Sequence, residues 1–477
     1  MSNRDLLPQL ASLGANGLIV PATKFKQSRT CASLFETRPE KIEIAYENIL
    51  FAEPSEKDET SIKISYGDVS KTSCIPKTVV AAFDGGDPAA VADEIMQKAY
   101  GAAKPKKRFL ILVNPNGGTG HAARVFKYAS EPLLRAANCS LNVVETTHRY
   151  HAQEIGAEIP MDKYDAIMCC SGDGIPHEVI NGMASRPEDG AQLLQSVAIC
   201  QLPCGSGNSL SWSLNGTSSA SIATLKMIKG RAIPVDYMAV TQGDKRVVSF
   251  LSQAWGLVAD LDLGTEHLRW MGGARFTVGA IARIINRKAY PCEIAVKVHT
   301  RDVRELSKHY QKYIVDRVDP LSSEEIAKLD PNVFASLKYG SVNDPIPSDW
   351  EVSTSKEMAN FYTGKMPWVS ADSLAFPAAI PHDGLIDVMT WDGKVGRSDA
   401  VNLLVASETG RHIDLPVAGY MKIEAFRITP IGKSDYISID GESFPIEPYQ
   451  VEVLPRAGLY LAHEGTYIRS GFPFKKY

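Results

Sequence analysis

The stretch FLILVNPNGGTG, residues 109–120, joins an apolar run to a glycine-dense loop. The pattern recurs where one apolar run leads into Gly172 and Gly174 and another leads into Gly205 and Gly207. A short apolar run bounded by turn residues is typical of a buried strand. The sequence therefore predicts strands over residues 109–113, 166–170 and 197–202, each followed by a glycine loop at its carboxyl end.

Loops of this kind suit a phosphate group. A loop without Cβ atoms lets backbone N–H groups approach an anion, and a following helix adds the positive end of its dipole. Open α/β sheets also bind ligands at the carboxyl ends of their strands. No Lys-Ser or Lys-Thr follows the first glycines as a P-loop requires, and residues 114–120 lack the Rossmann glycine spacing. Three such loops predict a polyphosphate ligand that is bound by neither a P-loop nor a Rossmann fingerprint.

Length and composition indicate a soluble chain of several domains. At 477 residues the chain has room for about three domains of ordinary size. It is 44% hydrophobic and 22% charged, and its sequence shows no apolar stretch of the ~18 residues that a membrane-spanning helix needs. We see no secretory signal, so we expect a cytoplasmic protein with reduced cysteines. A net charge of −4 does not favour nucleic acid as a partner.

The N-terminal segment, residues 1–103, combines short β-like runs with a helical pattern over residues 87–100. This favours a small α+β domain, and both a pleckstrin-homology-like (PH-like) domain and an unrelated α+β domain are open. The basic run at residues 104–108 is interpreted as a linker, with a localisation or membrane-contact patch as the alternative.

The rest of the chain shows two different patterns. Residues 104–234 alternate strand and helix patterns, which predicts a Rossmann-like α/β lobe with a parallel sheet in three layers. Residues 235–477 are rich in strand patterns, so we expect a β-rich antiparallel sandwich lobe with one helix near residues 272–288. The polar stretch at residues 303–358 is predicted to be a helical and loop insertion in this lobe.

Asp173 is the candidate catalytic residue. It stands between Gly172 and Gly174 at a predicted strand end, where a carboxylate can face solvent and a bound phosphate together. Phosphorylation of an alcohol needs a base for the hydroxyl proton and stabilisation of charge on the phosphoryl group. An isolated turn aspartate more often satisfies its own backbone. The neighbouring glycine loops favour the catalytic interpretation here.

Five ordered blocks of this sequence resemble known lipid kinases. The strings LVNPNGGTG, SGDGIPHEVINGM and LPCGSGNSL resemble the catalytic domain that sphingosine kinases and diacylglycerol kinases share. The strings SQAWGLVADLDLGTEHLRWMGGARFTVG and ISIDGESFPIEP resemble sphingosine (sphingoid long-chain base) kinases specifically. The resemblance covers residues 109–461 and leaves out the N-terminal segment and the insertion.

The resemblance implies a role for each matching residue. Asp173 would be the catalytic base, and the cofactors would be ATP and a Mg²⁺ ion that arrives with the nucleotide. The residues that the resemblance assigns to nucleotide binding are Asn114, Gly117, Gly118, Thr119, Gly120, Thr146, Arg149, Ser171, Gly172, Gly174, Glu178, Gly205, Ser206, Gly207, Arg269, Arg275, Asp440, Gly441 and Glu442.

Some of these assignments have ordinary alternatives. By spacing alone, Arg269 and Arg275 are typical of the solvated face of a basic helix, and only the resemblance favours a phosphate contact. The dipeptide Asp440-Gly441 is typical of a hairpin turn. A turn can also be a site, so both interpretations of it stand.

The choice of substrate depends on acidic residues in an apolar setting. A sphingoid base has a primary ammonium, neighbouring hydroxyls and a long alkyl chain. By resemblance, Asp262 would bind the ammonium, with Glu266 close by and Ser252 near a hydroxyl. The alternation of Asp and Leu over residues 259–263 is otherwise typical of a half-exposed strand. Diacylglycerol has no cation to pair with such a carboxylate, which favours a sphingoid base.

Residues 275–288 carry apolar side chains at helical spacing with basic residues among them. This pattern is typical of a helix that roofs a lipid slot, touches an anionic membrane or packs on its own core. Because the lipid substrate must be collected from a bilayer, we expect transient membrane contact and a peripheral location. A homodimer is left open.

These observations predict an ATP-dependent lipid kinase that transfers the γ-phosphoryl group to the primary hydroxyl of a sphingoid base and forms sphingoid base 1-phosphate. Diacylglycerol, ceramide or NAD as the acceptor is the first alternative, and Asp262 and Glu266 speak against the neutral lipids. A non-catalytic membrane-associated binding protein is the second alternative. The presence of Asp173, Asp440 and Glu442 speaks against it.

Overall fold

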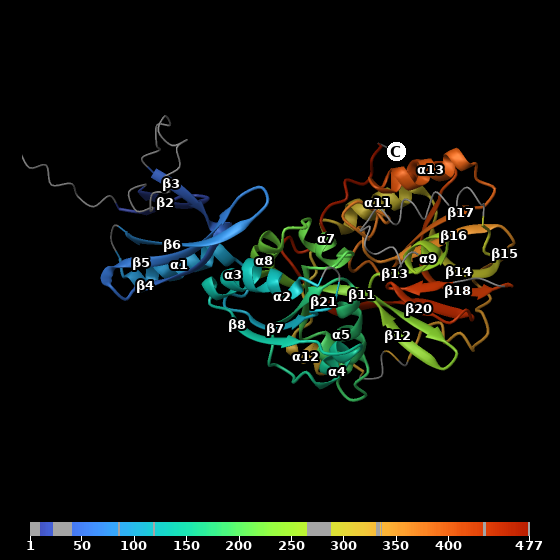
Figure 1. Cartoon of the computed structure of the whole chain (residues 1–477), viewed down its shortest axis with the longest axis horizontal. Coiled ribbons are helices and arrows are strands. Elements are labelled where there is room, and N and C mark those ends of the chain that lie inside the picture. Colours follow the sequence, from blue (N-terminus) through green and yellow to red (C-terminus); the bar gives the residue numbers. More distant parts are fainter. Residues whose placement is uncertain are drawn as a thin grey trace, which may run out of the picture. The chain divides into compact units, whose positions relative to one another are not determined.

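A computed structural model describes residues 10–21, 41–83, 86–117, 120–264, 288–330, 334, 336–432 and 436–475 (Figure 1). The chain divides into two compact units. The first comprises Met1–Arg108, Arg124–Leu141 and Ser219–Arg231, and the second comprises Phe109–Ala123, Asn142–Ser218 and Ala232–Tyr477. Because these units do not follow chain order alone, domain boundaries after residues 103 and 234 stay predictions.

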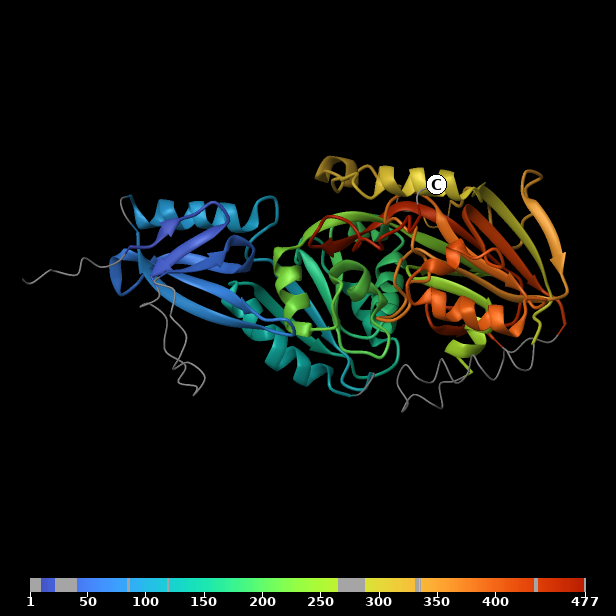
Figure 2. The ribbon, with the colours of Figure 1, turned by 90° about the horizontal axis from the view of Figure 1, so that it is seen from above.

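The first unit contains two small antiparallel sheets and several helices. One sheet consists of β4 (Ile49–Ser55), β5 (Asp58–Val69) and β6 (Cys74–Ala82), and the other of β1 (Ser12–Leu13), β2 (Gly17–Pro21) and β3 (Lys41–Ala45). The helix α1 (Pro88–Tyr100) begins after Asp87, whose side chain accepts a hydrogen bond from Ala89 N, and it packs on β4 (Figure 2). These are elements of a small α+β fold, and its PH-like character stays a prediction.

A buried lysine joins α8 (Ala220–Lys229) to the rest of the first unit. Lys229 Nζ donates to three carbonyl oxygens, those of Tyr46, Ile49 and Ala99. It also lies 3.9 Å from the ring centroid of Tyr100. Burial lowers the pKa of Lys229 to about 7. The end of α8 is therefore part of the interior of this unit.

The second unit contains the predicted parallel strands. β9 (Ala166–Ser171) pairs in parallel with β7 (Arg108–Val113) on one side and with β10 (Ala198–Pro203) on the other, while β8 (Ser140–Glu145) follows β7. All residues of β9 are buried, as expected for a central parallel strand. The carboxyl ends of these strands meet at one edge of the sheet, where the glycine loops begin.

Helices α4 (His151–Glu158) and α5 (Gly174–Ala184) lie side by side in this unit (Figure 1). A Cβ on Gly182 would lie 2.1 Å from the oxygen of Gln153, and one on Gly156 would lie 2.7 Å from the oxygen of Val179. Only glycine allows two backbones to approach so closely. The contact fixes α5, whose first residue is Gly174, against α4.

One long strand connects the parallel and antiparallel parts of the sheet. β21 (Tyr449–Ala462) pairs in parallel with β10 at Tyr460 and antiparallel with β18 (Gly419–Pro430) over residues 449–452. Beyond β18 the sheet continues through β17 (Ile386–Asp392), β16 (Met358–Gly364), β13 (Ser252–Gly256), β19 (Ile437–Ile439) and β20 (Glu442–Phe444). The hairpin of β11 (Arg231–Gln242) and β12 (Lys245–Ser249) pairs with β21. A mixed sheet with an antiparallel region confirms the coarse fold prediction.

The predicted insertion adds a strand as well as helices. It contains α11 (Val303–Tyr313) and α12 (Ser323–Ile326), which appear in yellow in Figure 2. It also contains β15 (Glu351–Ser355), which pairs antiparallel with β14 (Cys292–Thr300). Leu306 and Tyr310 of α11 are buried in an apolar cluster of the β-rich part. The insertion is therefore packed into the second unit.

The strand interpretation of residues 259–263 is wrong, because these residues lie in or next to a helix, α9 (Leu257–Asp262). Asp260 is buried, and its carboxylate accepts hydrogen bonds from Lys288 Nζ at 2.8 Å and from the Tyr290 hydroxyl at 2.6 Å. Gly256, at φ +98°, ends β13 immediately before the helix. The alternation of Asp and Leu was misleading because one of the two acids is an internal ion-pair partner.

A buried ionic network lies among the strands of the β-rich part. Lys365 Nζ lies 2.9 Å from an Asp236 oxygen and 2.6 Å from an Asp383 oxygen. Lys422 Nζ lies 2.7 Å from oxygens of both Asp383 and Asp387. His309 of α11 contacts Asp383 at 3.0 Å. The lysine and aspartate side chains are 0% exposed, so they compensate one another's charge away from water.

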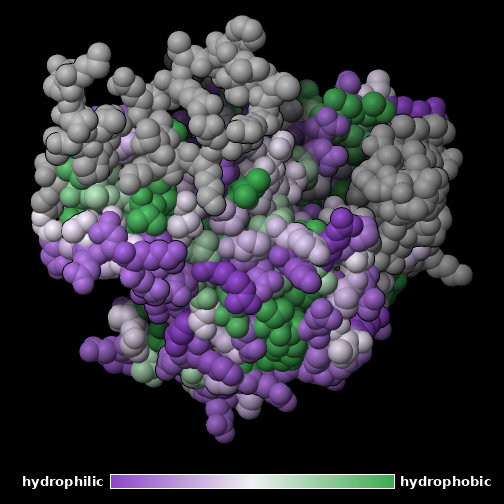
Figure 3. Space-filling view, turned by 60° about the vertical axis from the view of Figure 1, so that its left-hand side comes forward, coloured by the Kyte–Doolittle hydropathy of each residue, from purple (hydrophilic) through white to green (hydrophobic). Residues whose placement is uncertain are grey.

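Exposed large apolar side chains are spread along the described chain, from Leu10 to Ile431. In Figure 3 the hydrophobic areas lie between hydrophilic ones. Among the described residues, no helix has the length and apolar character needed to cross a membrane.

Candidate active site

Asp173 lies between β9 and α5 and is held in place by neutral donors. Its carboxylate accepts hydrogen bonds from the Ser209 N–H and hydroxyl, both at 3.0 Å, from Leu210 N at 3.3 Å and from Gln201 Nε2 at 3.1 Å. Ser209 and Leu210 begin α7 (Ser209–Asn215). Burial raises the pKa of Asp173, and these donors oppose the rise. The geometry thus presents an oriented carboxylate that has kept its basicity.

The second and third glycine loops touch each other beside this carboxylate. A Cβ on Gly205 would lie 2.3 Å from Gly172 Cα, and one on Gly207 would lie 3.1 Å from Asp173 Oδ2. Asn208 closes the third loop, because its side chain accepts from Gly205 N and donates to Gly205 O. A side chain at position 205 would push the loops apart. The two loops contain the predicted residues Ser171, Gly172, Gly174, Gly205, Ser206 and Gly207.

The first glycine loop begins next to the second. Asn114 N donates to Cys170 O at 3.2 Å, and Asn114 Oδ1 accepts from Asn116 N at 3.0 Å. Thr146 is brought to the same place because its N–H donates to Val113 O at 2.8 Å. Of the predicted loop residues, Asn114, Gly117 and Gly120 are described, whereas Gly118 and Thr119 lie outside the described residues. The described parts of all three loops begin at the carboxyl edge of the parallel sheet.

Charged residues from distant parts of the chain meet at the start of α5. Arg149 Nη2 lies 3.1 Å from Glu442 Oε2, and a Cβ on Gly174 would lie 3.9 Å from Glu442 Oε1. Glu178 accepts from Ala152 N at 3.2 Å, and burial raises the pKa of Glu178. Arg149 is 70% exposed, so its guanidinium is accessible to an anionic ligand. The predicted residues Arg149, Gly174, Glu178 and Glu442 therefore gather beside the Asp173 turn.

The Asp440 carboxylate holds residues 249–252 in place beside the candidate site. Its carboxylate accepts hydrogen bonds from Ser249 Oγ, from the N–H groups of residues 250, 251 and 252, and from His177 Nδ1 at 2.8 Å. Asp440 and Gly441 also form the hairpin turn between β19 and β20, at φ +53° and +86°. The turn interpretation of this dipeptide is thus correct for the backbone. The network positions Ser252, and contact of Asp440 with a nucleotide stays a prediction.

Asp262 and Ser252 meet around a residue that sequence reasoning missed. Asp262 accepts from Ser438 Oγ at 2.7 Å, and a Cβ on Gly441 would lie 3.7 Å from its Oδ2. Tyr362 of β16 has the Ser252 hydroxyl as a hydrogen-bonding neighbour. Burial raises the pKa of Tyr362, and the charges of Asp262, Asp173 and Asp440 raise it further. The predicted amine ligand therefore lies beside the turn of Asp440 and Gly441, and the charges of both predicted carboxylates act on one buried tyrosine.

Glu266, Arg269 and Arg275, like the predicted helix near residues 272–288 apart from Lys288, lie outside the described residues. Gln201, His177 and Tyr362 are additional residues of the site. Gln201 lies in a buried strand, and His177 follows the second loop at helical spacing, but neither position shows its partner in the sequence. Tyr362 is one aromatic residue in a strand pattern, which by itself predicts a core position.

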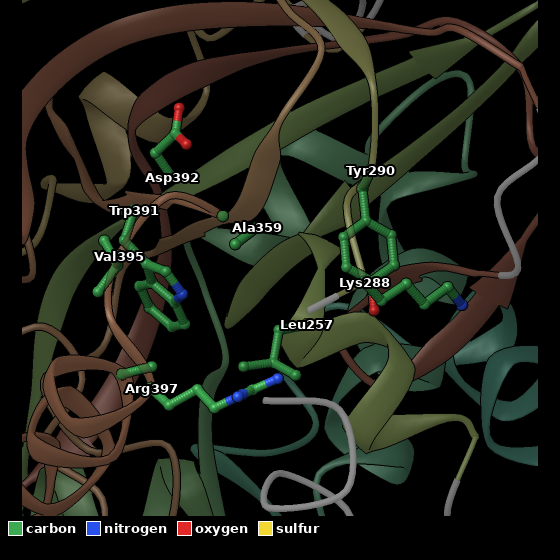
Figure 4. Close-up of a pocket in the computed structure, with 10 residues that line it drawn as sticks. Leu257, Lys288, Tyr290, Ala359, Trp391, Asp392, Val395 and Arg397 are labelled. Atoms are coloured by element: carbon green, nitrogen blue, oxygen red, sulfur yellow. The ribbon is translucent and has the colours of Figure 1, made fainter. Parts of the chain in front are cut away.

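A small pocket lies next to α9 (Figure 4). Leu257 at the start of α9 and Trp391 at the end of β17 face a common space, and Arg397 reaches toward Leu257. Ala359, Tyr290 and Val395 add apolar surface to the lining. The helix that carries Asp262 at one end therefore borders, at its other end, a pocket with both apolar and charged lining residues.

Comparison with known proteins gives matches over most of the chain. Residues 108–240 match the family model of the diacylglycerol kinase catalytic domain. The sphingoid long chain base kinase 4 of Schizosaccharomyces pombe is 30% identical over 434 residues, which cover 88% of each chain. Sphingosine kinase 1 of Arabidopsis thaliana is 31% identical over 367 residues, which cover 73% of this chain and 71% of that protein.

The chain belongs to the sphingosine kinase family.

Another family member, sphingoid long chain base kinase 5 of Saccharomyces cerevisiae, is 36% identical over 436 residues. The alignment covers 80% of this chain, and the chain spans 63% of the length of that relative. A crystal structure of a diacylglycerol kinase from Bacillus anthracis str. Sterne aligns with a TM-score of 0.50 and 17% identity, over 76% of this chain and 98% of that chain. This structural likeness shows that the sphingosine kinase family member described here has a diacylglycerol-kinase-like fold.

Proposed function

We propose that this protein is an ATP-dependent lipid kinase that transfers the γ-phosphoryl group of ATP to the primary hydroxyl of a sphingoid long-chain base. The observation that carries the proposal is the juxtaposition of three glycine loops, the oriented Asp173 carboxylate and the Asp262 carboxylate: a Cβ on Gly174 would lie 3.9 Å from Glu442 Oε1, and a Cβ on the adjacent Gly441 would lie 3.7 Å from Asp262 Oδ2. The loops suit a polyphosphate, and the carboxylates suit an amino alcohol. Membership of the sphingosine kinase family supports both assignments.

Asp173 acts as the general base in this proposal. It accepts the proton of the primary hydroxyl as the oxygen attacks the γ-phosphorus, so that the new P–O bond forms while the bond to ADP breaks. A base works best when its pKa is not far below the operating pH, and burial raises the pKa of Asp173 in that direction. The neutral donors of residues 201, 209 and 210 hold its oxygens in a fixed orientation.

The nucleotide binds at the glycine loops. Their backbone N–H groups and the start of α5 face the phosphates, and Arg149 is placed to neutralise phosphate charge. Arg269 and Arg275 are assigned to the phosphates by family resemblance. Mg²⁺, when bound to the nucleotide, reduces the charge of the phosphate oxygens. Among the described residues no group of three or more His, Cys, Asp or Glu side chains could hold a metal ion.

The sphingoid base lies along α9. Asp262 at the end of the helix binds the ammonium, with Ser252 near a hydroxyl and Glu266 assigned by resemblance. The alkyl chain extends along the apolar cluster that includes Leu257 and Ala259, toward the pocket of Figure 4. A helix of six residues spans ~9 Å, which separates a polar head site from an apolar chain site by a suitable distance.

The cellular location that we propose for the enzyme follows from the properties of its substrate. A long alkyl chain keeps the base in a bilayer, so we propose a cytoplasmic enzyme that contacts membranes transiently and peripherally. The PH-like character of the N-terminal segment and a homodimer are further proposals. Flotation with lipid vesicles and light scattering of the purified protein test them.

The decisive experiment is a substrate panel. Purified protein with ATP and Mg²⁺ is incubated with sphingosine, dihydrosphingosine, phytosphingosine, diacylglycerol, ceramide and NAD, and labelled products are separated by chromatography. We expect phosphorylation of the three free bases. Labelling of diacylglycerol, ceramide or NAD in their place would overturn the proposal.

A further inference from the structure

We infer that Tyr362 is a specificity-determining residue that recognises the 4-hydroxyl group of hydroxylated sphingoid bases. The inference rests on the proposed function and goes beyond it, because it assigns a substrate preference to a residue outside the motifs of the sequence. It starts from the register of three neighbouring strands. Tyr362 of β16 lies directly opposite Ala254 of β13, and Ala254 lies directly opposite Ser438 of β19.

Residues that lie opposite each other in antiparallel strands share one face of the sheet. Tyr362, Ala254 and Ser438 therefore form a row on one face, and Ser252 lies diagonal to Tyr362 on that face. The Ala254 side chain is a single methyl group that is buried in the same apolar cluster as Tyr362. The Ser438 hydroxyl holds Asp262 at 2.7 Å, and α9 packs against all three strands.

The ring of Tyr362 is fixed. It packs against Phe376 with ring centroids 4.9 Å apart, and the residue is 7% exposed. It belongs to the same apolar cluster as Leu257, Ala259 and Trp391, along which the alkyl chain would extend. Ser252 lies diagonal to it on the same face, and the charges of Asp262, Asp173 and Asp440 add to burial in raising the pKa of Tyr362. Tyr362 thus stands where the polar head site changes into the apolar chain site.

The position of Tyr362 determines which hydroxyl group of the substrate it can contact. The primary hydroxyl lies on carbon 1 and must reach Asp173, and the ammonium lies on carbon 2 and binds Asp262. Carbons 3 and 4 follow toward the alkyl chain. A hydroxyl on carbon 4 is therefore the polar group closest to the chain site, where the Tyr362 hydroxyl is available as donor or acceptor. A base without that hydroxyl cannot form this hydrogen bond, so the base that carries the 4-hydroxyl is favoured by about one hydrogen bond.

The test compares phytosphingosine, which carries the 4-hydroxyl, with dihydrosphingosine, which lacks it. For the wild type we expect a higher kcat/KM with phytosphingosine. The substitution Tyr362→Phe keeps the ring and removes the hydroxyl. We expect it to lower the ratio of the two kcat/KM values, phytosphingosine over dihydrosphingosine, by about tenfold, the effect of one buried hydrogen bond.

Tyr449→Phe is the matched control. The Tyr449 hydroxyl is buried and has no hydrogen-bond partner among the described residues, so its removal should leave the ratio unchanged. A loss of activity toward both bases by the same factor in Tyr362→Phe would show a merely structural role and overturn the inference, as would an unchanged ratio. If the wild type phosphorylates neither base, the proposed function itself fails, which is a distinguishable result.

Discussion

Two aspartates of the second unit, Asp173 and Asp383, have opposite surroundings. Asp383 contacts Lys365, Lys422 and His309, and these contacts hold the pKa of Asp383 well below its usual range against the effect of burial. Asp173 is held by amide and hydroxyl donors only, among the hydrogen bonds described for it, and burial raises its pKa.

This difference distinguishes a structural role for Asp383 from the catalytic role proposed for Asp173. The negative charge of Asp383 is compensated by the protein's own cations, so this carboxylate is a poor base and a strong structural contact. Burial raises the pKa of Asp173, and its uncharged donors only partly oppose that rise. Under the proposed function, Asp173 is the reaction centre and Asp383 is a structural contact of the core.

The largest expected effect is that of Asp173→Asn. The amide cannot accept the hydroxyl proton, so we expect kcat to fall by about a hundredfold to ten-thousandfold. Nucleotide affinity, measured by titration calorimetry, should change little. Asp349→Asn is the control, since Asp349 is 61% exposed and pairs with Lys297 at the surface. Wild-type turnover in the Asp173 variant would exclude the role of base.

The matching substitution in the core, Asp383→Asn, should act on stability. It leaves Lys365 and Lys422 buried with one carboxylate fewer, which costs about 3–5 kcal/mol of the free energy of unfolding. Urea unfolding measures this loss, and the molecules that stay folded should keep their kcat. A large fall in kcat without a loss of stability would contradict the division between the two aspartates.

The contribution of the Asp383 ion pairs to folding stability should depend on pH in a defined direction. Because the pKa of Asp383 is lowered in the folded state, its contribution to stability is present at neutral pH and above the ordinary carboxyl pKa. That contribution is lost as the pH falls through the folded-state pKa. We expect acid unfolding of the wild type to be steeper than that of Asp383→Asn in circular-dichroism titrations. Parallel curves would contradict the assigned pKa direction.

Lys229 extends the comparison to a buried cation with neutral partners in the first unit. Its pKa is lowered to about 7, so the folded state loses its proton more easily than the unfolded state, whose lysine titrates near 10.5. Stability of the first unit should therefore rise by about 2 kcal/mol between pH 7 and pH 9. Hydrogen exchange of that unit measures the change. Lys229→Met should remove it, and an unchanged slope in the variant would contradict the account.

Much of the fold could be predicted because local patterns and tertiary structure agree. The predicted strand at residues 109–113 lies within β7, and the helical pattern predicted at residues 87–100 contains α1. The strand interpretation of residues 259–263 is wrong because Asp260 is buried in contact with Lys288 and Tyr290. A local sequence pattern does not reveal such distant partners.

The candidate site shows the same limit. The glycine loops and Asp173 are visible in the sequence because a phosphate loop needs glycine at neighbouring positions. Tyr362 is not visible, because its role depends on the register of β13, β16 and β19. The five donors of Asp440 come from residues about 190 and 263 positions away in the chain, and sequence spacing cannot show them.

The central claim is that an acidic head site beside a neutral-donor base requires a substrate that brings its own cation. The direct measurement compares kcat/KM for a free sphingoid base with that for its N-acetyl derivative, which keeps the hydroxyls but has no charge, in the wild type and in Asp262→Asn. We predict a preference of about a hundredfold for the free base in the wild type and its collapse to within about threefold in the variant. Equal use of both substrates by the wild type, or an undiminished preference in Asp262→Asn, would contradict the account.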